Sequence, residues 1–241
     1  MRIVGLIGSA IALFVFVWAV YTHHVGREAH ILFHEGSERG DHQKLTAADA
    51  LFADLLRLQP RALLPLDWAA TQSNRAAELR MLGQMEHATA RLEEAVATYR
   101  EALQEYPRHS APIRWAAIQN DLGLTLWRLG ERGDGTARLK EAVLAFQAAL
   151  QERTRDRAPI QWAMTKCALG FPLTRIAERE GEIGVLRETA TAYDAALSLL
   201  ISAGENGRAA ICRTGRDQVI ALLNKNPAGE NNPGAASFPD D

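Results

Sequence analysis

Residues 112–158 read PIRWAAIQNDLGLTLWRLGERGDGTARLKEAVLAFQAALQERTRDRA, and this stretch decides the fold. The preceding 47 residues, 65–111, align with it without a gap and share 21 identical positions. The recurring prolines are Pro65, Pro112 and Pro159, and the recurring tryptophans are Trp68, Trp115 and Trp162. A fixed period of this length is the signature of a repeat architecture, in which each unit stacks on the next.

Two helical patterns occupy each unit. In residues 112–158 the first begins at Pro112, whose fixed φ suits the first turn of a helix, and its apolar residues follow helical spacing until about Gly130. The second follows Asp134, a predicted N-cap, and carries an apolar stripe from Leu139 onward. One hairpin cannot bury its own stripe, whereas stacked hairpins can. We therefore predict an all-α fold, an antiparallel helix-hairpin solenoid.

The same period divides the whole chain. The predicted parts are residues 1–27 as an anchor and juxtamembrane segment, 28–64 as a half-repeat, 65–111, 112–158 and 159–205 as three repeats, 206–224 as a capping helix, and 225–241 as a disordered tail. The recurring tryptophans follow the structural register, so we expect them in the core. Pro172 lies within the first helix of the third repeat and should kink or interrupt it.

Residues 3–21, IVGLIGSAIALFVFVWAVY, carry no charge. A membrane-spanning helix needs about 20 apolar residues, and Trp18 and Tyr21 at the end of the run suit a membrane–water interface. We predict an uncleaved single-pass transmembrane helix before the solenoid, with a cleaved signal peptide as the alternative. The short start at Arg2 favours a chain that lies mainly outside the cytoplasm, although positive residues after the run, such as Arg27, favour the reverse.

The spacing Ala142-x-x-x-Phe146-x-x-Ala149 and the pair Leu122-Gly123 resemble the tetratricopeptide repeat, and the 47-residue period resembles the long-repeat bacterial branch of that family. The usual repeat has 34 residues, so the difference implies longer helices. The resemblance implies a superhelix with a concave surface that is lined by the first helix of each repeat. Such a surface holds a peptide or a partner protein.

The family register places a set of candidate partner-binding residues on that surface. They are Ser73, Arg80, Asn120, Trp127, Arg128, Thr174 and Arg175. Arg80, Arg128 and Arg175 would form a basic row that could grip the carboxylates of an acidic partner segment with two-pronged hydrogen bonds. The alternative is a solvated face with local pairs between Arg128 and Glu131 and between Arg175 and Glu178.

Composition excludes some classes of function. The 27 Lys and Arg residues nearly balance the 29 Asp and Glu residues, so the formal charge is −2 and no basic surplus indicates a nucleic-acid ligand. The sequence contains no phosphate-cradling glycine loop, no nucleophile elbow and no CxxC pair. We therefore predict a protein that is not an enzyme and uses no cofactor.

Histidines and cysteines each leave an alternative open. His30 and His34 are one helical turn apart and could chelate a transition metal with help from Glu35 or Asp41, but a polar juxtamembrane stretch is the preferred interpretation. Cys167 and Cys212 are expected to be buried free thiols, and pairing outside the cytoplasm is the alternative. We infer no metal site from these residues.

The leading functional prediction is a membrane-anchored scaffold or adaptor, held in the membrane by residues 3–21, that binds a partner protein or peptide on its concave face. The alternative is a structural or accessory subunit of a membrane complex that is held mainly by its transmembrane helix. Metal binding through the juxtamembrane histidines is the least favoured. The sequence predicts no particular oligomeric state.

Overall fold

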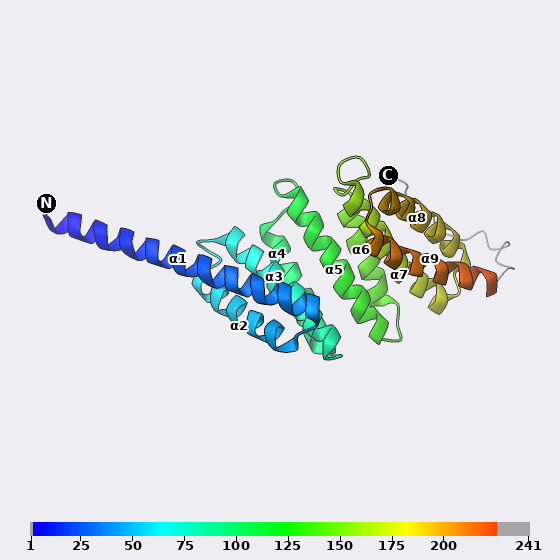
Figure 1. Ribbon diagram of the computed structural model, residues 1–241, viewed down its shortest axis with the longest axis horizontal. Coiled ribbons are helices and arrows are strands. Elements are labelled where there is room, and N and C mark those ends of the chain that lie inside the picture. The colour runs from blue at the N-terminus through cyan, green and yellow to red at the C-terminus, as the bar shows by residue number, and fades with distance from the viewer. Residues whose placement is uncertain (1, 226–241) are drawn as a thin grey trace. The chain divides into compact units, whose positions relative to one another are not determined.

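The computed structural model describes the backbone of residues 2–225 and the side chains of residue 13 and residues 15–225. Within these residues the chain forms nine α-helices and no strand, so the all-α prediction is confirmed there. The helices are α1 (Arg2–Arg39), α2 (His42–Leu58), α3 (Pro65–Met85), α4 (Thr89–Glu105), α5 (Pro112–Arg132), α6 (Ala137–Leu150), α7 (Pro159–Glu180), α8 (Ile183–Ser202) and α9 (Asn206–Lys225) (Figure 1). Most of the predicted tail, residues 226–241, lies outside the described residues.

The chain divides into two compact units. Unit 1, residues 1–105, contains the hairpins α1/α2 and α3/α4, and α2 packs against α3. Unit 2, residues 106–241, contains the hairpins α5/α6 and α7/α8, with α9 packed against α8 and α7. Each helix that begins a predicted repeat starts at its proline, because an N-terminal turn needs no amide donor at that position.

Each hairpin closes around one buried aromatic ring. The four rings are Phe52, Tyr99, Phe146 and Tyr193, spaced 47 residues apart and almost fully buried. In unit 2 glycine makes the close crossing possible, because a Cβ on Gly123 would lie 2.9 Å from the Phe146 ring. A Cβ on Gly170 would lie 2.3 Å from Tyr193 Cζ. The recurring small residue opposite the ring therefore sets the distance between paired helices.

A second recurring contact shows that α1 and α2 pack like the later hairpins. The glycines of this contact are Gly36, Gly83 and Gly130, and each faces a leucine nine residues later: Leu45, Leu92 and Leu139. The C-terminal part of α1 therefore occupies the place of a first helix. The segment expected to be a half-repeat, residues 28–64, belongs to a complete hairpin once α1 is included.

The N-terminal part of α1 extends past α2, its hairpin partner (Figure 1). Its described apolar side chains are widely exposed: Leu13, Val15, Phe16, Val17 and Val20 expose between 53% and 66% of their surface. In the described part of the chain, no helix has the length and apolarity needed to cross a membrane. The side chains of residues 1–12 and 14, which make up much of the predicted span, lie outside the description.

Two local predictions are wrong. Helix α7 continues through Pro172, so of the two expected effects, a kink or an interruption, the interruption does not occur. Proline removes one backbone hydrogen bond, and Pro172 is buried, which indicates that packing around α7 offsets that loss. Asp134 does not cap α6, which begins after Thr136 with no side-chain cap, because Asp134 lies in an exposed turn two residues earlier.

The recurring tryptophans are partly exposed and not fully buried as expected, although Trp162 packs against the buried cluster of unit 2. Each lies in the first turn of its helix, where the ring is covered by an arginine seven positions earlier. The distances from guanidinium carbon to ring are 4.8 Å for Arg61 and Trp68, 5.5 Å for Arg108 and Trp115, and 5.6 Å for Arg155 and Trp162. The repeated tryptophan therefore lies where the preceding loop meets the first helix of the repeat, and a cation–π contact holds it there in part.

Candidate binding surface

An aromatic pair joins the first helices of the two hairpins in unit 2. Trp127 of α5 and Phe171 of α7 stack with their ring centroids 4.8 Å apart and their planes 19° apart. Phe171 in turn meets the buried ring of Tyr193 edge to face at 6.0 Å. Trp127 and Phe171 are only half-buried, so part of the stack faces solvent. We call the surface formed by Trp127 and Phe171 the aromatic platform.

Arg128 adds a cation to the aromatic platform. Its guanidinium carbon lies 4.1 Å from the centroid of the Trp127 ring, within the range of a cation–π interaction. The Arg128 side chain is exposed, so it places a positive charge at the surface of the platform. Trp127 and Arg128, two of the residues expected on the binding surface, are therefore brought together with Phe171.

Arg175 forms hydrogen bonds with two glutamates of its own unit. Its Nε and Nη2 donate to the two carboxylate oxygens of Glu131 at 2.8 and 3.2 Å, and its Nη1 donates to Glu178 at 2.7 Å. The hydrogen bond to Glu131 is the largest influence on the Arg175 pKa and raises it further, although partial burial opposes the shift. The local pair with Glu178 occurs as the alternative interpretation proposed, so two carboxylates already neutralise Arg175.

Thr174 and Ser73 direct their hydroxyl groups into their own helices. Thr174 is 3% exposed and donates to the Gly170 carbonyl at 2.7 Å, so the expectation that it faces a ligand is wrong. Ser73 is half-buried and donates to the Ala69 carbonyl at 2.8 Å. Both hydroxyls satisfy backbone carbonyls one helical turn earlier, a common use of Ser and Thr within helices.

Asn120 belongs to a polar relay between α5 and α7. Its Oδ1 accepts from Thr165 Oγ1 at 3.0 Å, and Thr165 Oγ1 accepts from Arg153 Nη1 at 3.0 Å. Burial is the main influence on the Arg153 guanidinium and lowers its pKa, while the negative charge of Asp121 raises it. The Asn120 amide also donates to Asp121 at 3.2 Å, so the relay fixes the orientation of Asn120.

Arg80 belongs to unit 1, whereas Arg128 and Arg175 belong to unit 2. Its Nε atom is buried, and no hydrogen-bond partner for it exists among the described residues. The expected row of three arginines is therefore not a feature of either unit. The basic part of the platform in unit 2 is Arg128.

The histidines of the C-terminal part of α1, considered above as metal ligands, have separate neighbours. His30 Nε2 lies 3.1 Å from the Asn74 side-chain amide and meets the Phe52 ring edge to face at 5.6 Å. His34 lies 3.4 Å from Glu38 in the next turn. Within residues 2–225, no group of three or more His, Cys, Asp or Glu side chains is arranged to hold a metal ion.

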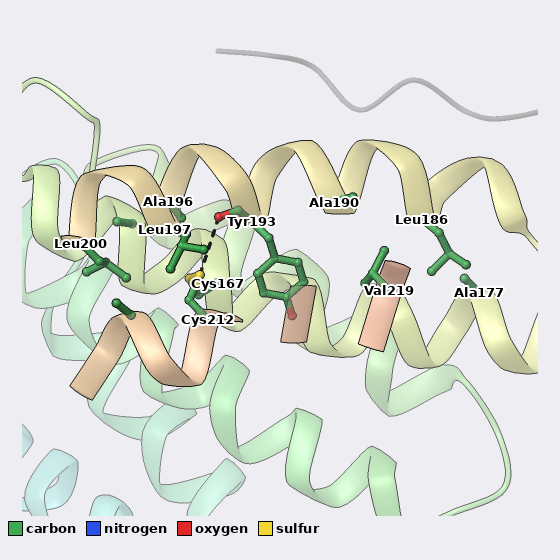
Figure 2. Close-up of a cluster of buried hydrophobic side chains, with 12 residues drawn as sticks. Cys167, Ala177, Leu186, Ala190, Tyr193, Ala196, Leu197, Leu200, Cys212 and Val219 are labelled. Carbon is green, nitrogen blue, oxygen red and sulfur yellow. Dashed lines mark hydrogen bonds between the residues drawn. A yellow bond between two sulfur atoms is a disulfide. The ribbon is translucent and has the colours of Figure 1, made fainter. Parts of the chain in front are cut away.

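Cys167 and Cys212 form a disulfide, so the expectation of free thiols is wrong and the alternative, that the two cysteines pair, is confirmed (Figure 2). They lie 45 residues apart on α7 and α9, whose backbones bring the two Cα atoms to 5.4 Å. The two cysteines are buried in the same cluster as Tyr193 and Ala196. The separation of the cysteines, 45 residues, is close to the 47-residue period. Helix α9 takes the place of the first helix of a next repeat and packs against α7, so this separation is the sequence signal for the contact.

Sequence reasoning missed Phe171, although a signal for it exists. Trp127 and Phe171 are 44 residues apart, and the same separation joins Glu131 to Arg175 and Thr136 to Glu180. Contacts between the neighbouring hairpins of unit 2 therefore join residues that are 44 positions apart, about one helical turn less than the 47-residue period. Applied to Trp127, this interval leads directly to Phe171.

No protein-family model matches the sequence, and no curated protein matches it. Two solved structures resemble the fold. BtubC (BKLC) from P. vanneervenii is 17% identical, with 97% of this chain and 96% of that chain covered and a TM-score of 0.48. A structure described as a DHF58 filament is 15% identical, with 87% and 95% covered and a TM-score of 0.38. Neither likeness carries an argument about function.

Proposed function

We propose that the chain is a membrane-anchored scaffold that binds a partner protein or peptide on the aromatic platform of unit 2. The observation that carries this proposal is the Trp127–Phe171 stack overlain by Arg128, which leaves two aromatic rings and a cation accessible on one face. Tryptophan and arginine are the residue types that most often dominate binding energy at protein interfaces. The resemblance to tetratricopeptide repeats supports the same class of function.

The chemistry of the platform favours a particular kind of partner segment. The stacked rings offer flat apolar area, and the exposed guanidinium of Arg128 offers a positive charge that attracts a carboxylate. Arg175 adds no free cation, because Glu131 and Glu178 hold it. The partner segment is therefore one with an apolar or aromatic side chain beside a single acidic group, and a long acidic tract is less suitable.

Membrane anchoring belongs to the same proposal. The uncharged run of residues 3–21 and the exposed apolar side chains between Leu13 and Tyr21 support an anchor. The disulfide between Cys167 and Cys212 supports a chain that lies mainly outside the cytoplasm, because disulfides persist in oxidising compartments. Positioning the platform near a membrane would restrict its partners to those at the same surface.

The exposed apolar stretch of α1 favours a second candidate, an accessory subunit that is held in a membrane complex mainly by this helix. Deleting residues 1–27 separates the two functions. A scaffold retains partner binding in solution, whereas an accessory subunit loses its complex. Helix α1 also packs on α2, so folding of the shortened chain must be checked by circular dichroism before the result is read.

A photo-crosslinking amino acid tests the platform directly in cells. Phe171→p-benzoylphenylalanine should crosslink one defined partner, and Arg128→Glu in the same chain should reduce the yield by about tenfold. Leu144→p-benzoylphenylalanine is the matched control, since Leu144 is an exposed apolar residue of α6. Equal crosslinking from positions 171 and 144, or an unchanged yield with Arg128→Glu, would reject the platform as the binding surface.

A further inference from the structure

Unit 1 contains a cleft between its first helices. The cleft has a volume of about 510 Å³ and is lined by α1, α3 and the end of α2. Trp18 lies among the lining residues at the membrane-proximal part of α1, and Leu55 and Gln59 contribute from α2. This volume is sufficient for a small polar group such as a phosphate ester with its substituent.

The cleft contains one cation and one anion that the protein does not pair. Arg27 on α1 and Asp67 on α3 both line it, and both are exposed. Among the described residues, neither forms an ion pair within 4 Å, whereas Arg75, another cation of unit 1, pairs with Asp49. A ligand with one charge of each sign would match the two unpaired groups.

Several other polar side chains of the cleft already have hydrogen-bond partners within the protein. Thr71 donates to Gln59 at 2.8 Å, and the Asn74 amide lies 3.1 Å from His30 Nε2. These pairs shape the walls and leave Arg27 and Asp67 as the groups that can bind a charged ligand. His23 also lines the cleft, one helical turn before Arg27 on α1.

The position of the cleft along α1 points to the source of the ligand, and this step rests on the proposed membrane anchor. The cleft begins at Trp18, within the last turn of the uncharged run, and continues to His30. Val20 and Tyr21, beside its first turn, expose 53% and 55% of their surface. Tryptophan and tyrosine favour the depth at which lipid headgroups lie, so an anchored α1 would hold the cleft at that depth.

We propose that this cleft binds the headgroup of a zwitterionic phospholipid that carries a primary amine, a phosphoethanolamine lipid. Arg27 binds the phosphate and Asp67 binds the ammonium group. Guanidinium suits phosphate through paired N–H donors, and a carboxylate suits an ammonium group that still has N–H donors. A headgroup with only negative charge would leave Asp67 facing like charge.

The full-length chain in lipid nanodiscs tests the proposal. Nanodiscs are made from phosphatidylcholine alone, or with equal additions of phosphatidylethanolamine or phosphatidylglycerol, and lipids that stay bound after mild detergent extraction are identified by native mass spectrometry. We expect about tenfold preferential retention of phosphatidylethanolamine over phosphatidylglycerol. Arg27→Gln and Asp67→Asn should each reduce this retention about tenfold. Arg57→Gln is the matched control, since Arg57 is an exposed arginine of α2 outside the cleft and should have no effect.

Flotation of the same chain with vesicles separates the two proposals. If the chain does not float with any vesicle, both the anchor and the headgroup site are rejected. If it floats but shows no headgroup preference, prefers phosphatidylglycerol, or is unaffected by Arg27→Gln and Asp67→Asn, the headgroup site alone is rejected. If soluble phosphoethanolamine displaces the retained lipid at equal concentration, the cleft recognises a free zwitterion and its assignment to lipid is wrong.

Discussion

Cys167 of α7 is joined to Cys212 of α9 by a disulfide that lies inside a buried cluster, and the Tyr193 carbonyl oxygen lies 3.8 Å from Cys212 Sγ (Figure 2). The bond connects the last hairpin to the helix that follows it. Helix α9 has few buried residues of its own, namely Ala209, Cys212, Gly215 and Val219. A covalent link is therefore an important part of what holds α9 in place.

Removing this disulfide should destabilise unit 2. Closing a loop of 45 residues restricts the unfolded chain by an amount equivalent to about 4 kcal/mol in the loop-entropy description. We expect the double variant C167A/C212A to lose about that much free energy of unfolding in urea denaturation at 25 °C. A reductant should lower the stability of the natural chain and leave the variant unchanged. Equal stability of the natural chain and the variant without reductant would show that the crosslink is dispensable.

Glu78 should make unit 1 less stable at alkaline pH. Its side chain has 0% exposure, and no side-chain donor among the described residues forms a hydrogen bond with either carboxylate oxygen. Burial, reinforced by the charge of Asp49, raises the pKa of Glu78 from 4.5 to about 8. The folded chain then binds more protons than the unfolded chain between these values, so stability falls as pH rises from about 4.5 to about 8.

The variant Glu78→Gln isolates this effect. It should match the natural chain near pH 4 and exceed its free energy of unfolding by up to about 5 kcal/mol near pH 9, since the pKa shift spans about 3.5 units and each unit corresponds to about 1.4 kcal/mol. The measurement is the difference between the two urea midpoints across the pH range, because other carboxyl groups titrate equally in both proteins. A constant difference from pH 4 to pH 9 would contradict the raised pKa.

The sequence was sufficient to predict the hairpins and their period. Proline at the start of a helix and an apolar stripe at helical spacing are local signals, so the beginnings of α3, α5 and α7 could be read from single repeats. The tryptophans show the limit of that reasoning. Recurrence of Trp68 and Trp115 identifies an equivalent position in each repeat, but it does not decide whether the position is buried or covered by arginine.

Contacts between hairpins were harder to predict, because they depend on the offset with which one hairpin stacks on the next. The link between Arg175 and Glu131 illustrates this. Helical spacing makes Glu178 a natural partner for Arg175, whereas Glu131 becomes a partner only when the 44-residue offset is known. The platform formed by Trp127 and Phe171 depends on the same offset.

Adding a methyl group at Gly170 should loosen the hairpin α7/α8. The new Cβ would lie 2.3 Å from Tyr193 Cζ, and the Tyr193 ring is enclosed by Gly215 on α9 as well. We expect Gly170→Ala to cost about 1–3 kcal/mol, as overpacking in a core usually does. Gly133→Ala is the matched control, because no atom lies within 4 Å of its Cβ position and its φ of −97° suits any residue. Thermal unfolding of both variants provides the comparison, and equal midpoints would show that Tyr193 can move aside.

Arg128 and Arg175 should differ in what their loss affects. Arg175→Ala leaves Glu131 and Glu178 without their shared cation, so we expect a loss of about 1 kcal/mol in stability, a modest value because the pair is partly solvated. Arg128→Ala removes an exposed cation over Trp127 and should change stability by less than about 0.5 kcal/mol. The loss of Arg128 should instead weaken the crosslink that p-benzoylphenylalanine at position 171 forms with the partner.

Because the two arginines lie in the same unit, denaturation and crosslinking of the two variants together separate a binding role from a structural one. If Arg175→Ala weakens the crosslink as much as Arg128→Ala without loss of stability, Arg175 leaves its carboxylates to bind the partner, and the platform extends to α7.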